Sequence, residues 1–365
     1  CWSKDTNPTI SDDTTDNGMT SSPATFTSDI TGLEKNTTYN LRAYAINDHD
    51  TSYSNGTSLT TLDLDLTGSG TQNDPYQVSS LQGLRDLSNV SALWESHFVQ
   101  TQDIDASETK NWNSGKGFLP IASGTVLGFK GSYNGAGHVI DNLYIDRNSE
   151  SSESVGLFAV LASNASVNNL SLTNIDVTGT LVVGGLVGRN AGTIEECSAS
   201  GNVIGSELIG GLIGYNNGSI NRSFSSGEVT GTASGVGGLI GTNDQGSVHN
   251  SYSTAICTGE QDIGGLVGIN DNMGNVFNCY STGSVSGNTN VGGFIARIQE
   301  GSATACFWDT VSSGISTSAG GTGKATAQMK DVATFLNAGW DFMEETDNGS
   351  NDYWGFNPDK NGGYP

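Results

Sequence analysis

The stretch Gly184-Gly185-Leu186-Val187 decides the fold, because two glycines followed by two apolar residues recur along this chain of 365 residues. Copies of the pattern start at residues 184, 210, 237, 264 and 292, so their spacings are 26, 27, 27 and 28 residues. A degenerate copy, Gly156-Leu157-Phe158, precedes them. A period of this regularity is typical of repeat architectures in which each unit packs only on its neighbours.

Each unit contains short apolar alternations separated by Gly, Asn and Ser, and no long helical periodicity. This pattern predicts about three short strands and three turns per unit, which together form one coil. We therefore expect an all-β protein, a right-handed parallel β-helix with short capping helices. About eight coils at the inter-strand spacing would give a rod roughly 40 Å long.

Aligned units predict which side chains point inward. One column holds Asn190, Asn216, Asn243 and Asn270, which can hydrogen-bond along the axis. An apolar column holds Ile194, Ile220, Val248 and Val276, and a column of small residues holds Cys197, Ser223, Ser251, Cys279 and Cys306. Cys279 and Cys306 lie on adjacent coils, where a disulfide is geometrically feasible, but small buried thiols are the favoured interpretation.

The repeat region is expected to have two capped ends. Residues 79–87 predict a short N-terminal capping helix with a Ser start, followed by irregular coils over 98–104 and 129–145. Residues 325–336 predict a second short helix. A C-terminal aromatic cluster is expected to cover the last coil, and it contains Trp340, Phe342, Tyr353, Trp354, Phe356 and Tyr364.

The pattern changes before residue 63. Alternating strands around Tyr39-Asn40-Leu41 and Leu59-Thr60-Thr61 predict a small Ig-like β-sandwich. The expected domains are a partial sandwich over 1–62, a linker over 63–72, the β-helix over 73–310 and a C-terminal cap over 311–365.

The repeat resembles the GLUG motif of bacterial adhesin-like surface proteins and of the non-catalytic region of IgA-protease-type metallopeptidases. The resemblance rests on Gly-Gly-Leu-Val-Gly-x-Asn, then Ile/Val-x-x-Cys/Ser-Tyr/Phe-Ser, then Gly-x-Val-x-Gly, and covers about residues 66–365. The first 61 residues are similar to the latter part of a fibronectin type III module of Bacteroidetes surface proteins. Because the resemblance starts mid-module, we expect the natural chain to extend upstream. Both resemblances imply surface display and adhesion and supply no catalytic residues.

Charge limits the partners. The chain has 14 Lys and Arg against 38 Asp and Glu, a net charge of −24, which disfavours nucleic acid. No apolar run reaches membrane-spanning length, so we expect no membrane insertion. Scarce Lys and abundant Asn, Ser, Thr and Gly, together with the resemblance, indicate an extracellular, cell-surface location. No cofactor is expected, although Ca²⁺ remains open at the acidic loop of Asp12, Asp13 and Asp16, whose default interpretation is a solvated turn.

Catalysis has little support in the sequence. His49, His97, His138 and His249 are isolated and form no His-Glu-x-x-His motif. A polysaccharide lyase or glycosidase remains an alternative, since β-helices host both, but Arg189, Arg222 and Arg297 and the acidic residues are scattered over different columns. An ice-binding face would need regular Thr columns, which are absent. We therefore expect no enzyme.

A binding surface is the favoured hypothesis. Phe224, Tyr252, Tyr280 and Phe307 share one outward column, with Trp308 beside the last and Tyr215 as a weaker addition. Such rings can stack on sugars or on apolar partner surfaces, or they can simply stabilise one another, which packing favours. The sequence thus predicts a non-catalytic adhesin or stalk segment that binds a glycan, matrix or another protein and adjoins further domains of a longer chain. A pure spacer is the other alternative.

Overall fold

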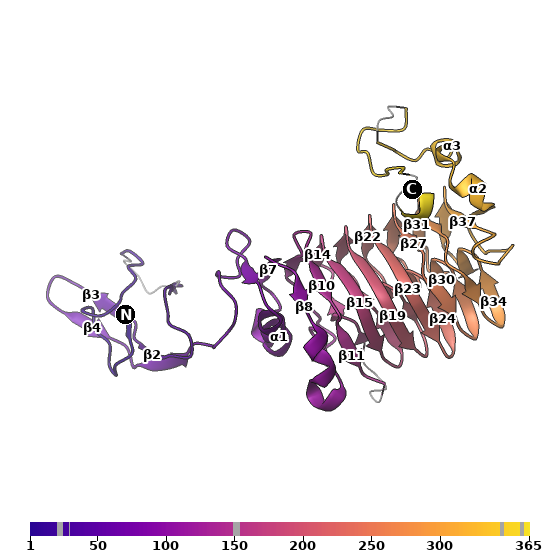
Figure 1. Cartoon of the computed structure of the whole chain (residues 1–365). Helices are drawn as coiled ribbons and strands as arrows, with labels where there is room; N and C mark the ends of the chain where they lie inside the picture. Colours follow the sequence, from indigo (N-terminus) through magenta and orange to yellow (C-terminus); the bar gives the residue numbers. More distant parts are fainter. Residues whose placement is uncertain (20–24, 29, 149–153, 344–346, 358–360) are drawn as a thin grey trace. The chain divides into compact units, whose positions relative to one another are not determined.

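The computed structural model describes residues 1–19, 25–28, 30–148, 154–343, 347–357 and 361–365. The chain forms two compact units, Cys1–Asp65 and Leu66–Pro365 (Figure 1). The boundary falls inside the linker expected over 63–72. Leu66 is buried and Thr67 forms a bridge with Gln77, so the second part of that segment belongs to the larger unit.

The smaller unit contains two antiparallel sheets. One consists of β1 (Trp2–Ser3), β2 (Thr38–Leu41) and β5 (Thr57–Thr60), and the other of β3 (Tyr44–Ile46) and β4 (Thr51–Tyr53). The Glu34 backbone N–H donates to the buried Tyr39 hydroxyl at 3.0 Å, a local contact typical of Ig-like sandwiches. Assignment to fibronectin type III stays a prediction.

The larger unit is a parallel β-solenoid whose strands lie in four sheets, named here A to D in the order in which a complete coil passes through them. Sheet A contains β12 (Ser154–Val155), β16 (Val182–Gly184), β20 (Ile209–Gly210), β24 (Ser234–Gly237), β29 (Gln261–Gly264) and β34 (Thr289–Gly292). Sheet B contains β13 (Phe158–Leu161), β17 (Val187–Asn190), β21 (Ile213–Asn216), β25 (Ile240–Asp244), β30 (Val267–Asp271) and β35 (Ile295–Ile298).

Sheets C and D extend beyond these six coils. Sheet C contains β6 (Tyr76–Val78), β7 (His97–Gln100), β9 (Ser132–Asn134), β14 (Ser166–Asn168), β18 (Thr193–Glu195), β22 (Ser219–Asn221), β26 (Ser247–His249), β31 (Asn275–Phe277) and β36 (Ser302–Thr304). Sheet D contains β8 (Ile104–Asp105), β10 (Val139–Asp141), β11 (Tyr144–Asp146), β15 (Ser171–Thr178), β19 (Ser198–Gly205), β23 (Phe224–Gly231), β27 (Tyr252–Ser253), β28 (Ile256–Thr258), β32 (Tyr280–Ser281), β33 (Val285–Ser286), β37 (Phe307–Asp309) and β38 (Thr322–Lys324).

A complete coil therefore has four strand positions, whereas the sequence predicted about three. The difference arises at the Gly-Gly pair, which forms a sharp corner between sheets A and B instead of lying within one strand. A Cβ atom on Gly210 would come 2.0 Å from the Ile213 carbonyl oxygen, and one on Gly211 would come 2.3 Å from that of Gly238. No side chain fits at either position.

The second glycine of each pair also packs across the coil interior on sheet D. The Ser225 hydroxyl, which points inward, donates to the Gly238 carbonyl at 2.6 Å, and the Ser281 hydroxyl donates to that of Gly293 at 2.8 Å. The cross-section of each coil is thus thin. This packing explains why the repeat needs glycine and small residues at facing positions.

The predicted inward columns are confirmed. Ile194, Ile220, Val248 and Val276 are fully buried, and in-register pairing places each on the next coil. The Asn ladder is also present. Asn190 Nδ2 donates to Asn216 Oδ1 at 2.8 Å, Asn216 to Asn243 at 2.7 Å and Asn243 to Asn270 at 2.7 Å.

The cysteines of the small column are free thiols in the structure, and Cys279 and Cys306 are not bonded to each other. Both are buried, and desolvation raises the pKa of the Cys279 thiol well above its usual value. Small buried thiols, the favoured interpretation, therefore describe this column.

The capping helix at the N-terminal end is α1 (Leu81–Asn89), whose N-cap Ser80 accepts from the Gly83 N–H at 3.0 Å. The single helix expected over 325–336 is instead two, α2 (Thr326–Met329) and α3 (Val332–Leu336). The break falls at Asp331, whose carboxylate accepts from the Ala333 N–H and caps α3. Short 3₁₀ turns cover Ser91–Leu93, Ser107–Asn111, Asn113–Gly115 and Asn361–Gly363.

Candidate functional site

The aromatic column exists as predicted and its rings stack along the axis. Phe224, Tyr252, Tyr280 and Phe307 pair in register on neighbouring strands of sheet D. The ring centroids of Phe224 and Tyr252 are 4.9 Å apart at an interplanar angle of 3°, and those of Tyr252 and Tyr280 are 4.9 Å apart at 1°. Burial raises the pKa of Tyr252 to about 12.

Half of this column is covered by the C-terminal segment. Tyr280 is fully buried and Phe307 nearly so, in a cluster with Met329, Phe335, Trp340, Phe342 and Trp354. The Tyr280 hydroxyl donates to the Pro365 carbonyl at 2.6 Å, and Trp340 Nε1 donates to the Ala305 carbonyl at 2.8 Å. The predicted aromatic lid therefore lies on the side of the last coils and not over their end, and Tyr280 and Phe307 are not exposed to a ligand.

The other predicted ligand-binding residues separate from the column. Trp308 points into the coil, in the inward column of Ser253 and Ser281, and donates from Nε1 to the Ile315 carbonyl at 3.0 Å. Tyr215 lies on sheet B, beneath the Arg189 guanidinium at 4.3 Å, and its hydroxyl donates to Asp244. Phe224 and Tyr252 are half-buried, so only these two rings of the column keep an accessible side.

The predicted Ca²⁺ loop does not assemble. The Asp12 carboxylate accepts from the Thr9 N–H at 2.8 Å, and the Asp16 carboxylate accepts from the Gly18 N–H at 2.8 Å. The Asp13 main chain pairs with Trp2. These are turn contacts, and no three His, Cys, Asp or Glu side chains gather anywhere in the described ranges.

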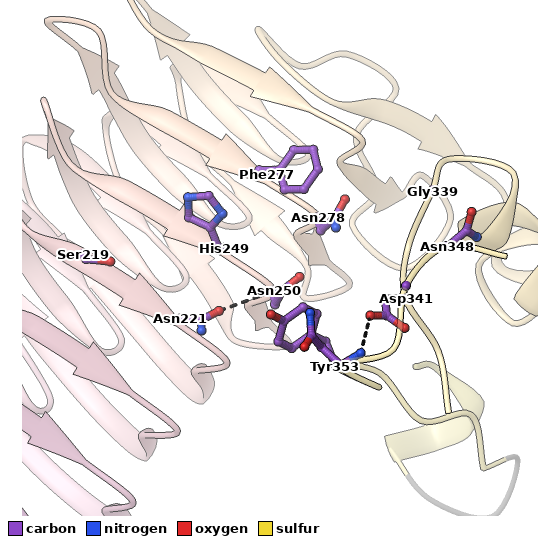
Figure 2. A pocket seen from close by; sticks show the side chains of 12 residues that line it. Ser219, Asn221, His249, Asn250, Phe277, Asn278, Gly339, Asp341, Asn348 and Tyr353 are labelled. Atoms are coloured by element: carbon purple, nitrogen blue, oxygen red, sulfur yellow. Dashed lines mark hydrogen bonds between the residues drawn. The ribbon is translucent and has the colours of Figure 1, made fainter. Parts of the chain in front are cut away.

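A groove with a volume of about 500 Å³ lies between sheet C and the C-terminal segment (Figure 2). One wall comes from sheet C and the corner that follows it, and the other comes from residues 339–343 and 347–353. The lining residues are Ser219, Asn221, His249, Asn250, Phe277, Asn278, Gly339, Asp341, Asn348, Gly349, Asn351 and Tyr353. A second hollow of about 520 Å³ shares Asn351 and Tyr353 and adds Glu196, Arg222 and Asp352.

The floor of the groove is formed by the corner between sheets C and D. Glu196, Arg222, Asn250, Asn278 and Ala305 occupy equivalent corner positions and all have positive φ, between 48° and 53°. Asn tolerates this left-handed backbone better than most residues. On two successive coils the corner therefore places a short amide side chain, Asn250 and then Asn278, along the groove.

The amides of this corner have a defined polarity. The Glu195 carboxylate only accepts, so Asn221 donates to it from Nδ2 at 3.3 Å and presents its own Oδ1 to the Asn250 Nδ2 at 3.2 Å. Asn250 Oδ1 is then buried without a donor, and so is Asn278 Oδ1 on the next coil. The series of side-chain hydrogen bonds along the corner therefore ends at Asn250, and the groove floor there presents acceptor oxygens.

The opposite wall adds a third acceptor. Asp341 is 6% exposed, and its Oδ1 is buried without a donor. Its Oδ2 accepts from the Asn351 N–H at 2.9 Å, which closes the loop that carries Tyr353 (Figure 2). Gly349 fits against this carboxylate because a Cβ atom there would lie 2.4 Å from Oδ2.

Rings form the remaining surface. His249 and Phe277 lie on neighbouring strands of sheet C with centroids 5.9 Å apart. Partial burial lowers the pKa of His249 from its usual value of 6.5, so the imidazole is neutral at pH 7. At the far end the Arg222 guanidinium lies 5.8 Å from the Tyr353 ring and pairs with Glu195 at 3.0 Å and with Glu196 at 2.7 Å.

The sequence prediction missed this groove. Its corner residues recur at 196, 222, 250, 278 and 305, spacings of 26, 28, 28 and 27, so the column was visible in the repeat. Nothing in the sequence, however, showed that residues 339–343 and 347–353 lie beside it. Side-chain amides, one carboxylate and flat rings in a cavity of this size suit a small polar ligand that also has an apolar face.

These features define the class of the larger unit, a parallel β-solenoid of Gly-Gly coils with an open lateral groove. The family described as the GLUG motif matches residues 179–204, 232–258 and 259–286, and the chain therefore contains GLUG repeats. The coil between the first two matches has the same structure and register.

Two named relatives share part of the chain. Halomucin of Haloquadratum walsbyi is 41% identical over 150 residues, which is 40% of this chain and 2% of that protein. A protein named Gly-rich membrane protein, from Evansella cellulosilytica, is 36% identical over 135 residues, 36% of this chain and 15% of that one. The chain thus spans a small fraction of either relative.

Solved structures support the fold. One named as an immunoglobulin A1 protease from Bacteroides ovatus has a TM-score of 0.58 at 19% identity, over 75% of this chain and 90% of that one. Another, named IgA1 protease, has a TM-score of 0.50 at 20% identity, over 79% of this chain and 23% of that one. At these identities the likeness concerns architecture alone. No helix in the described ranges is long and apolar enough to cross a membrane.

Proposed function

We propose that this chain is a non-catalytic segment of an extracellular surface protein, and that it binds a glycan in the groove between sheet C and residues 339–343 and 347–353. The observation that carries the proposal is the lining of the groove, where amide side chains of successive coils lie beside Phe277 and opposite Tyr353. Amides supply hydrogen bonds to hydroxyl groups, while rings pack on the apolar face of a sugar.

A non-catalytic role fits the charges of the groove. Of the described residues that line it, Asp341 is the one carboxylate, whereas the usual glycosidase mechanism uses a pair. The GLUG repeats and the acidic surface are consistent with display outside the cell. The partial sandwich over 1–62, if it belongs to a type III module, would link this segment to neighbouring domains.

The test is a glycan array followed by calorimetry with the full chain, comparing the parent protein with Tyr353→Ala and Tyr215→Ala. Tyr353 lines the groove and is 37% exposed, whereas Tyr215 lies on sheet B outside it. We expect binding without turnover, weakened about tenfold or more by Tyr353→Ala and unchanged by Tyr215→Ala. Release of reducing ends or unsaturated uronates would establish an enzyme instead, and no binding to any glycan would leave a spacer.

A further inference from the structure

The side chains that line the groove indicate the charge of the ligand that it binds. This inference rests on the proposed function. The buried polar side-chain atoms that line it without a partner are Asn250 Oδ1, Asn278 Oδ1 and Asp341 Oδ1. All three are acceptors. Asn278 and Asp341 are each only 6% exposed, so their oxygens have lost most of their contact with solvent. A buried acceptor without a donor costs free energy, and a buried carboxylate oxygen costs more.

The orientation of the Asn250 amide is fixed, which excludes a simple exchange of its oxygen and nitrogen. Glu195 can only accept, so it orients Asn221, and Asn221 in turn orients Asn250, whose Oδ1 is left without a donor. Asn250 and Asn278 are equivalent corner residues on paired coils, about 4.8 Å apart. One donor-bearing group placed between them can reach both oxygens.

The described residues that line the groove include no cation that could donate to these three oxygens. None of the described lining residues is Lys or Arg, and the one histidine, His249, is neutral at pH 7 because partial burial lowers its pKa. Asp341 therefore gives the groove a charge of −1, in a molecule whose net charge is −24. The Phe277 ring also favours a positive group over its face. The Arg222 guanidinium, 5.8 Å from the Tyr353 ring, is already paired with Glu195 and Glu196.

We propose that the groove binds an amino-bearing saccharide, whose protonated amine donates to the acceptor floor of Asn250, Asn278 and Asp341 while the sugar ring packs against Phe277 and Tyr353. An ammonium group supplies three donors and a positive charge, and so satisfies oxygens that nothing in the chain satisfies. Anionic polysaccharides are excluded by the same carboxylate and by the surface charge.

The test compares three β-linked oligosaccharides of equal length by calorimetry with the full chain: a glucosamine oligomer, its N-acetylated form and a uronate-containing oligomer. We expect the amine form to bind about tenfold or more tightly than the N-acetylated form, and the uronate form not to bind. Asp341→Asn should reduce the preference about tenfold, since it keeps the shape and the acceptor for the Asn351 N–H while removing the charge. Asn278→Asp should increase the preference for the amine form, and Asp tolerates the same left-handed backbone.

Non-specific attraction of a cation to an acidic protein needs its own control. Glu228→Gln removes one charge from the outer side of sheet D, away from the groove, and should leave the affinity unchanged. Equal effects of Glu228→Gln and Asp341→Asn would overturn the inference. So would binding of tetralysine at the affinity of the amine oligomer. Preferred binding of the N-acetylated or uronate form, lost in Tyr353→Ala, would overturn it while leaving the proposed function intact, and no binding of any saccharide would remove both.

Discussion

The Asn ladder of sheet B is the most regular polar feature at the scale of single residues. Each amide donates to the next coil, and Asn190 and Asn216 also accept from a backbone N–H of their own turn, as from Gly192 N–H to Asn190 Oδ1 at 3.0 Å. All four ladder residues are fully buried. In a dry interior, such a chain of bonds stabilises the stack only while every member is present.

Asn243→Ala should therefore lower the free energy of unfolding by about 2–4 kcal/mol. The substitution leaves one of the two N–H groups of Asn216 Nδ2 without an acceptor and Asn270 Oδ1 without its donor, at about 1–3 kcal/mol for each group. Urea unfolding followed by circular dichroism measures the change. Asn202→Ala, exposed on β19, is the matched control and should change stability by less than about 0.5 kcal/mol. Equal effects of the two would show that the ladder is not stabilising.

His249 should make stability depend on pH. Its pKa is lowered in the folded chain by desolvation, so between pH 6.5 and that lower pKa the unfolded chain binds more protons than the folded one. Stability contributed by the neutral imidazole is complete above pH 6.5 and is lost as the pH falls through this window. The difference in Tm between the parent and His249→Gln, measured from pH 8 to 5, should shift against the parent as the pH falls. A constant difference would contradict the burial of the ring.

At the scale of elements, the C-terminal segment owes its position to aromatic packing and not to sheet pairing. The rings of Trp340 and Phe335 are 4.7 Å apart and those of Trp340 and Trp354 are 4.5 Å apart, and all three pack on the end of the aromatic column. The only described pairing within this segment is the bridge of Phe342 with Trp354. The groove wall thus depends on one small hydrophobic cluster.

Trp340→Ala should release this segment while the solenoid stays folded. Loss of a fully buried Trp side chain costs about 3–5 kcal/mol of packing free energy. A short segment held by few backbone hydrogen bonds is not expected to stay docked after that loss. Hydrogen exchange followed by mass spectrometry should show faster exchange over 326–343 and unchanged protection of β17, β21, β25 and β30. Met343→Ala, 61% exposed, should leave both regions unchanged. Global unfolding of Trp340→Ala would mean that the segment supports the whole solenoid.

The sequence predicted the repeating elements and the N-terminal capping helix, but not the position of the C-terminal segment. Every inward column follows from the period, because residues one coil apart must occupy equivalent positions. The place of residues 339–343 and 347–353 follows from no period, and an exposed ring platform and a buried ring cluster have the same pattern in the sequence. Tyr280 and Phe307 were therefore predicted in the correct column, but as exposed side chains, whereas they are buried.

At the scale of the whole molecule, each complete coil contacts chiefly the coils before and after it, and neighbours pair in register. Stability in such an array is approximately a sum over coils and their interfaces. A complete coil can then be removed without loss of the fold, provided that the cut joins equivalent positions.

Deletion of residues 211–237 provides this test, because it joins Gly210 to Gly238 at equivalent corner positions. We expect a folded chain with the β-sheet circular dichroism spectrum of the parent and a lower Tm, since one inter-coil interface is lost. Deletion of 218–231, about half a coil, is the control and should unfold the chain because it shifts every later column out of register. Equal folding of both variants would contradict the in-register stack.

The same stack has a mechanical consequence. In all four sheets the hydrogen bonds between coils run along the axis, so tension applied to the two ends of the solenoid loads the coils in series. The terminal coil, with a neighbour on one side only, yields first and passes the load to the next. Each release frees 26 to 28 residues, or roughly 90 Å of extended chain. Under load the solenoid would therefore unfold one coil at a time and lengthen in nearly equal steps.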